Sequence, residues 1–133
     1  MTKLTFYTTE KTLLLKYPKI FRQKDLPMSE TCMCWGIECG RGWYHLIDNL
    51  CYHLQQLTDN DGHPQIEFVQ VKEKFGSLRI YVNEASEMQH LLIEFVENLS
   101  CTVCENCGKP GNIIDNGHYW IKTLCDDCME KIN

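Results

Sequence analysis

Two pairs of cysteines near the C-terminus constrain this chain more than any other feature. Each pair has the spacing C-x-x-C, and seventeen residues separate Cys107 from Cys125. Four thiolates in this pattern are typical of a tetrahedral zinc site, because each C-x-x-C turn presents two sulfurs to one ion. The spacing therefore predicts Zn²⁺ as a cofactor, with four ligands: Cys104, Cys107, Cys125 and Cys128.

The residues after the first pair favour a sharp turn. Gly108, Pro110 and Gly111 follow Cys107, and glycine permits backbone conformations in which amides face the sulfurs. Cys101 offers an alternative first pair with Cys104, but the turn follows Cys107, so we expect Cys101 to be a small buried thiol on a helix. A site closed by four thiolates leaves no position for water or substrate, so the predicted zinc is structural.

Length and composition indicate a globular protein. At 133 residues with 44% hydrophobic content, the chain fits a core over residues 1–100 and a small zinc-ribbon lobe over residues 101–133. No stretch approaches the roughly 20 apolar residues of a membrane span, and the polar start Met1–Thr5 does not resemble a signal peptide. Nine cysteines, four of them with metal spacing, favour a reducing cytoplasm over a disulfide framework.

The net charge of −5 argues against a general nucleic-acid binder, which needs a cationic surface. The charge is uneven: residues 1–24 carry six Lys/Arg and one acid, whereas residues 84–130 carry nine acids and two lysines. A solvated surface explains such asymmetry more often than a binding site does.

The apolar pattern predicts an α+β fold with helices around a small hairpin. A helix is expected over residues 9–17, capped by Thr8 or Thr9 and ended by Pro18, before a long irregular segment over 22–40. The clearest helix has one apolar stripe, formed by Trp43, Leu46, Ile47, Leu50, Cys51, Leu54 and Leu57.

A β-hairpin should follow, with strands over residues 66–71 and 78–82 and Gly76 in its turn. A two-stranded sheet is marginal, so we expect helices to cover it from both sides, or a third strand from the ribbon or from a dimer mate. Asn83 is the expected N-cap of a further helix, on which the zinc lobe packs. Its predicted inward face is Met88, Leu91, Leu92, Phe95, Val96 and Leu99.

Two further cysteine hypotheses concern the irregular segment. Cys39 precedes a helix, and with His45 as a base, oriented by Glu38 or Asp48, it is a candidate nucleophile. No nucleophile signature accompanies these residues, so we do not favour catalysis. A second metal site would use Cys32, Cys34 and Cys39, but their spacing matches no common zinc knuckle.

The hairpin carries Lys72, Lys74 and Arg79 around Phe75. Basic groups beside an aromatic ring can hold a phosphate or a base by charge and stacking. Lysines at a hairpin tip also keep an exposed strand edge soluble, and this interpretation is the more common one.

Four sequence blocks together resemble a known family. They are Trp35–Tyr44, Gln70–Arg79, Cys104–Gly111 and Trp120–Cys125. The combination resembles a family of short zinc-ribbon proteins encoded by tailed phages and prophages, over residues 17–128. The resemblance implies an accessory protein in the cytoplasm of an infected bacterium. Arg41 stands where this family leads us to expect an acidic residue.

The leading functional hypothesis is a non-catalytic protein that binds a host protein, in a takeover or anti-defence role. Binding to nucleic acid, or sequestration of a signal nucleotide in the pocket of a homodimer, is the second hypothesis. A hydrolytic enzyme using Glu38, Cys39 and His45 is the third. Aromatic and arginine side chains dominate protein interfaces. The candidate contact residues are therefore Trp35, Glu38, Trp43, Tyr44, Lys72, Lys74, Phe75 and Arg79.

Overall fold

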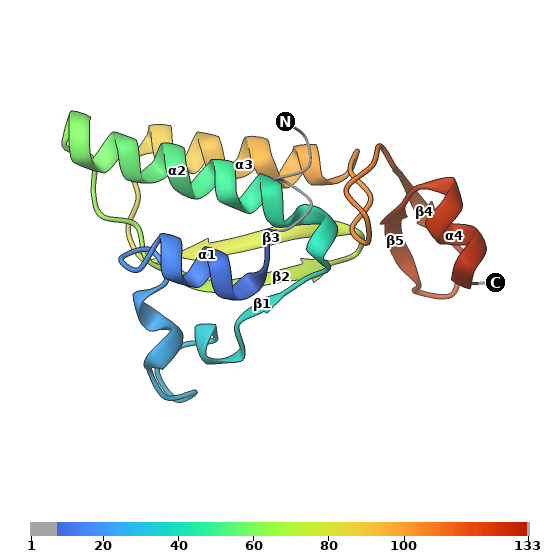
Figure 1. The fold of residues 1–133 in the computed structure, drawn as a ribbon, viewed down its shortest axis with the longest axis horizontal. Coiled ribbons are helices and arrows are strands. Elements are labelled where there is room, and N and C mark those ends of the chain that lie inside the picture. The colour runs from blue at the N-terminus through green and yellow to red at the C-terminus, as the bar shows by residue number, and fades with distance from the viewer. Residues whose placement is uncertain (1–7, 133) are drawn as a thin grey trace.

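The computed structural model describes residues 8–132 and has the predicted α+β architecture (Figure 1). Two helices lie over one face of a three-stranded sheet, and a two-stranded ribbon with a short helix forms the C-terminal end. The start Met1–Thr5, predicted not to be a signal peptide, lies outside the described residues. None of the described helices is long and apolar enough to cross a membrane.

The first helix, α1 (Glu10–Lys16), begins and ends as predicted. The hydroxyl of Thr9 accepts a hydrogen bond from the amide of Thr12, which caps the helix. The backbone leaves the helix at Tyr17, the residue before Pro18. The segment that follows contains η2 (Arg22–Asp25) and η3 (Met33–Trp35), two short 3-10 helices.

The longest helix, α2 (Tyr44–Asp61), follows a third 3-10 turn, η4 (Arg41–Trp43). It ends at Gly62, whose φ of 74° is the left-handed conformation that glycine adopts without steric cost. The predicted stripe is buried in the core at Leu46, Ile47, Leu50, Cys51 and Leu54.

The sheet has the order β1-β2-β3, formed by β1 (Ile37–Glu38), β2 (Phe68–Lys74) and β3 (Ser77–Val82). The antiparallel β2–β3 hairpin turns at Phe75 and Gly76, whose φ values of 52° and 82° are both positive, as a type I′ turn requires. The third strand does not come from the ribbon, so that one of the predicted alternatives was wrong. It is β1, which pairs in parallel with β2.

The helix α3 (Glu87–Ser100) begins three residues later than predicted. Its N-cap is Ser86, which forms a capping box with Gln89. Asn83 instead accepts a hydrogen bond from the amide of Glu67 at 2.9 Å, and so links the ends of β2 and β3. This long-range bond removes Asn83 from the helix cap.

The prediction of which face of α3 points inward was largely wrong. The core side carries Gln89, Ile93, Val96 and Ser100, so Val96 is the predicted residue that is buried there. Leu92 is half-buried, whereas four predicted core residues are exposed: Met88, Leu91, Phe95 and Leu99. The inward polar side chains are satisfied, because Gln89 donates to the Pro64 carbonyl (2.8 Å) and the Ser100 hydroxyl accepts from the Leu78 amide (2.9 Å).

The C-terminal ribbon consists of β4 (Asn112–Asp115), β5 (Ile121–Leu124) and α4 (Asp126–Ile132). It contacts η4 and the β2–β3 turn. The amide of Gly42 donates to the Glu105 carbonyl at 2.7 Å, and the Thr123 hydroxyl donates to the Gly76 carbonyl at 2.6 Å. The approach at Gly42 is so close that a Cβ there would collide with the carbonyl oxygen of Cys104. The domain boundary at residue 100 stays a prediction.

Candidate metal centre

The sulfur atoms of Cys104, Cys107, Cys125 and Cys128 all lie within 4.8 Å of one another. Zinc–sulfur bonds of about 2.3 Å in a tetrahedron place sulfurs about 3.8 Å apart, so the cluster fits one metal ion. The Sγ atoms of Cys107 and Cys125 are 3.6 Å apart, whereas a disulfide needs about 2.05 Å. The structure therefore brings together the four residues that the sequence predicts as ligands.

The first pair lies in a tight turn. The amide of Gly108 donates to the Cys104 carbonyl at 2.9 Å, and the amide of Cys104 donates to the Lys109 carbonyl at 2.7 Å. Gly108 has a φ of 86°, which explains the glycine after Cys107. The local sequence thus sets the spacing of the two sulfurs.

The second pair lies where β5 meets α4, with Cys125 directly before α4 and Cys128 within it, and it receives hydrogen bonds at sulfur. The amide of Cys128 approaches Cys125 Sγ at 3.5 Å, and Asn106 Nδ2 donates to Cys128 Sγ at 3.2 Å. Such donors stabilise thiolates, and thiolates are the form of cysteine that binds a metal. Asn106 thus connects the first turn to the second.

The electrostatics of the cluster match the needs of a metal site. Burial opposes ionisation of Cys104, but the backbone amides of Cys125, Cys107 and Asn106 lower the pKa of its thiol to about 7. Burial and the neighbouring sulfurs, against the opposing effect of the Lys109 amide, together raise the pKa of Cys107 to about 12. Cys104 therefore ionises readily, whereas ionisation of Cys107 requires a cation to offset the repulsion of the neighbouring sulfurs.

The remaining cysteines lie outside this cluster. Cys101 is the C-cap of α3 and is half-buried, and Cys51 is fully buried in the core as predicted. Cys32, Cys34 and Cys39 belong to no group of three or more metal-ligating side chains among residues 8–132. His118, between β4 and β5, is exposed.

The environment of Cys39 opposes its use as a nucleophile. Burial, followed by the charges of Glu105, Glu10 and Glu73, raises the pKa of this thiol far above its ordinary value. A nucleophilic cysteine needs the opposite shift. Of the two carboxylates proposed to orient the base, Asp48 accepts from Lys16 and Tyr17, and Glu38 is exposed on β1. Burial lowers the pKa of His45, which favours the neutral form that a base needs, so it is Cys39 that opposes catalysis.

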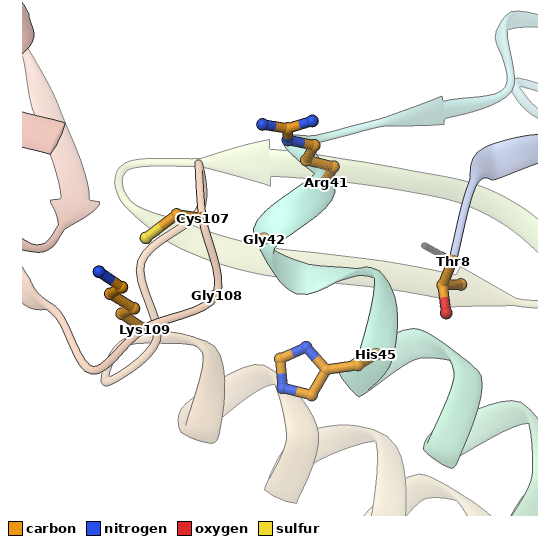
Figure 2. Close-up of a pocket in the computed structure, with 7 residues that line it drawn as sticks. All are labelled: Thr8, Arg41, Gly42, His45, Cys107, Gly108 and Lys109. Atoms are coloured by element: carbon orange, nitrogen blue, oxygen red, sulfur yellow. The ribbon is translucent and has the colours of Figure 1, made fainter. Parts of the chain in front are cut away.

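A cavity of about 330 Å³ lies beside the metal cluster (Figure 2). His45, from the first turn of α2, lines it together with Arg41, Cys107 and Lys109. Figure 2 shows Arg41 and Lys109 extending from different sides of the cavity, and neither reaches His45. The cavity holds two cationic side chains, but the candidate nucleophile Cys39 is not among the residues that line it.

Several predicted contact residues share the outer face of the sheet. Strand register aligns Glu38 with Lys72 and Lys72 with Arg79, in one row across three strands. Lys74 lies two residues along on the same face, because side chains alternate along a strand. Phe75 is exposed at the hairpin tip.

The aromatic residues of the predicted loop differ in accessibility. Trp35 is exposed and Tyr44 is half-buried, where burial raises the pKa of its phenol. Trp43 is fully buried, so its side chain is not available as a surface contact.

Sequence reasoning missed Glu105, a buried carboxylate between the first two ligands. It accepts a hydrogen bond from the Gly40 amide at 2.9 Å and lies 3.6 Å from Lys122 Nζ. Lys122 also pairs with Glu73 at 3.2 Å. These contacts join the ribbon to the core. They were not predictable from the sequence, because the C-x-x-C pattern places no requirement on the residue at position 105.

No family model, no curated protein and no solved structure matches this chain. Its function is therefore argued from the geometry of the molecule and the chemistry of its surfaces.

Proposed function

We propose that this chain is a small zinc-containing protein that acts by binding another protein. One observation carries the proposal: α3 exposes four large apolar side chains on the surface of a well-packed domain. Their exposed fractions are 51% for Met88, 62% for Leu91, 63% for Phe95 and 38% for Leu99. We call these four residues the α3 stripe.

The α3 stripe is favourable for binding because its side chains follow one another along a single helix. The residues are separated by three or four positions, which places them on adjacent turns of one face. Contiguous apolar patches on monomeric proteins are rarely larger than a few hundred Å², and larger ones mark interaction sites. Burying such side chains against a partner supplies the main driving force for association.

Zinc has a structural role in this proposal. Cys104, Cys107, Cys125 and Cys128 would hold it, and the ion would stabilise the fold of the ribbon without reacting. Four thiolates complete the tetrahedron, so no position remains for a substrate. The ribbon then supports η4 and the start of α2 through its contacts with Gly42 and Trp43.

The proposed partner is a protein of the bacterial host, and the setting is a phage-infected cytoplasm. The resemblance of four sequence blocks to a phage and prophage family supports this context. The proposed role in that setting is takeover of the host or defeat of its defences, because a non-catalytic accessory protein changes the cell by binding one of its proteins.

The test is affinity capture of the tagged chain from infected bacteria, with Phe95→Ser compared with Leu15→Ser. Leu15 is 69% exposed on α1, so its substitution removes a similar apolar side chain from a different surface. We expect a stoichiometric host protein with the wild type and with Leu15→Ser, and its loss with Phe95→Ser. Recovery of no stoichiometric partner, or equal recovery with both variants, would contradict the proposal.

The outer face of the sheet supports a second candidate, binding of single-stranded nucleic acid. Lys72 and Arg79 are cross-strand neighbours, and Lys72 Nζ lies 5.8 Å from the centre of the exposed ring of Tyr81. Exposed aromatic rings flanked by cations provide stacking and phosphate contacts. Steep weakening of binding with salt, and its loss in the triple variant Lys72→Ala/Lys74→Ala/Arg79→Ala, would favour this candidate.

A further inference from the structure

An apolar groove separates α2 from α3 on the side that faces away from the sheet. Figure 1 shows the two helices side by side over the sheet. The groove has a volume of about 230 Å³, and its walls are almost entirely carbon. The apolar residues that line it are Leu46, Leu50, Leu92, Phe95, Val96 and Leu99.

The groove continues into the α3 stripe, because Phe95 and Leu99 belong to both. The helices α2 and α3 form two ridges with the apolar groove between them. A third helix can pack into such a groove by ridge-into-groove packing. An amphipathic helix that docks in this way places its own apolar residues, which recur every three or four positions, in the groove.

The charged residues of α2 and α3 themselves have a single sign. All of the Asp, Glu, Lys and Arg residues in the sequences of α2 and α3 are acidic. On the outward side, Glu87 and Glu94 are exposed next to the α3 stripe, and on the α2 side the polar residues Asn49 and His53 line the groove. The six acidic residues of the two helices are Asp48, Asp59, Asp61, Glu87, Glu94 and Glu97.

We infer that the groove between α2 and α3 binds an amphipathic helix whose polar side carries Lys and Arg. The inference rests on the proposed function and adds the chemical class of the partner. The apolar face of such a helix fills the groove and extends over the α3 stripe, and its basic residues meet Glu87 and Glu94, which are exposed beside that stripe. A second copy of this chain is disfavoured, because it would bring the same carboxylates against them.

The experiment uses two labelled synthetic peptides of about 18 residues, or five helical turns. Both carry leucine at positions i, i+3, i+4 and i+7. One has lysine at the remaining positions and the other has glutamate. Fluorescence anisotropy with the full-length, zinc-loaded protein at about 0.15 M salt measures the dissociation constant of each. We expect the lysine peptide to bind at least about tenfold more tightly than the glutamate peptide, a difference of about 1.4 kcal/mol.

Variants separate groove binding from general attraction to an acidic protein. Phe95→Ser should weaken the lysine peptide by about tenfold or more, whereas Leu15→Ser should leave its affinity unchanged. Glu87→Gln/Glu94→Gln should weaken the lysine peptide and reduce its advantage over the glutamate peptide. Circular dichroism and zinc content verify that each variant is folded.

Three results would overturn the inference. They are equal affinity for the two peptides, lysine-peptide binding that Phe95→Ser leaves unchanged, and a dimer in sedimentation that Phe95→Ser dissociates. The proposed function is tested separately by host-protein capture. If capture depends on Phe95 while the peptides bind equally, the binding function stands and the class of partner is wrong. If capture fails while the lysine peptide binds in the groove, the proposal of a host-protein partner is wrong, and the inference that the groove binds a basic amphipathic helix is supported.

Discussion

The indole nitrogen of Trp43 donates a hydrogen bond of 2.7 Å to the carbonyl oxygen of Val103. Trp43 precedes α2 and is fully buried, whereas Val103 lies directly before the first metal ligand, Cys104. The bond therefore joins the start of the longest helix to the base of the ribbon. Because the Trp43 side chain is fully buried, the place of its indole donor is not open to water that could replace it.

Trp43→Phe should destabilise the protein by about 1–3 kcal/mol. The substitution keeps an aromatic ring in the core but leaves the Val103 carbonyl without its donor, and an unsatisfied buried acceptor costs free energy of this size. Urea unfolding of the zinc-loaded protein measures the change. The matched control is Trp35→Phe, because Trp35 is exposed, and its effect should stay within about 0.5 kcal/mol. Equal losses in the two variants would contradict the structural role of Trp43.

Removal of the metal should unfold the ribbon while α2 stays protected. The buried cluster of the ribbon contains Leu124 and three of the cysteines, so little apolar surface holds it together without an ion. Hydrogen exchange after chelation should accelerate over residues 104–128 and change little over Leu46–Leu54. Native mass spectrometry should find one zinc per chain before chelation.

Two cysteine variants complete the metal experiment. Cys125→Ser should reproduce the exchange pattern of the chelated protein, because it removes one ligand of the cluster. Cys101→Ser should keep one zinc and the wild-type pattern, because Cys101 lies outside the cluster. Two zinc ions per chain would support the hypothesis of a second metal site at Cys32, Cys34 and Cys39.

Glu67→Gln should lower stability at neutral pH but not in acid. The Arg22 guanidinium donates two hydrogen bonds to this carboxylate at 2.8 and 2.9 Å and, with Gln23, lowers the pKa of Glu67 below its ordinary value of 4.5. A carboxyl group whose pKa is lowered by folding stabilises the folded state above its unfolded pKa. This contribution is lost as the pH falls below 4.5 through the folded pKa.

Urea midpoints at several pH values test the Glu67 prediction. The wild type should have the higher midpoint at pH 7, and the difference from Glu67→Gln should disappear in acid. The loss should be small, because Arg22 is largely solvated. Glu30→Gln, on an exposed loop, is the control and should show no pH-dependent difference. A difference that persists unchanged into acid would rule out the ion pair as its cause.

The metal cluster was predictable from the sequence because neighbouring residues determine the geometry of each cysteine pair. The C-x-x-C spacing and the conformation of Gly108 set each half-site within a few residues. The helix pattern of α2 was predictable for the same reason, since one apolar stripe stands against a polar face.

The orientation of α3 was not predictable, because two stripes compete along the same helix. The stripe with more apolar residues faces solvent, and the buried face contains Gln89 and Ser100. Those two polar residues are buried because Pro64 and Leu78, far away in sequence, satisfy their hydrogen bonds. Local periodicity contains no information about such partners. The row formed by Glu38, Lys72 and Arg79 and the third strand likewise depend on long-range pairing, of β1 with β2 and of β2 with β3.

The orientation of α3 makes a direct prediction for stability. Ile93 is buried and Phe95 is exposed, because residues two positions apart lie on nearly opposite faces of a helix. Ile93→Ala should destabilise the protein by about 2–5 kcal/mol, because it removes core contacts and leaves a cavity. Phe95→Ser should change the free energy of unfolding by no more than about 0.5 kcal/mol, as is usual for a solvated position. Urea unfolding of both variants at equal protein concentration measures the difference. A large loss in Phe95→Ser that grows as the protein is concentrated would show that the stripe is covered by a second copy, and a large loss independent of concentration would show that α3 is rotated toward the face that its apolar pattern favours.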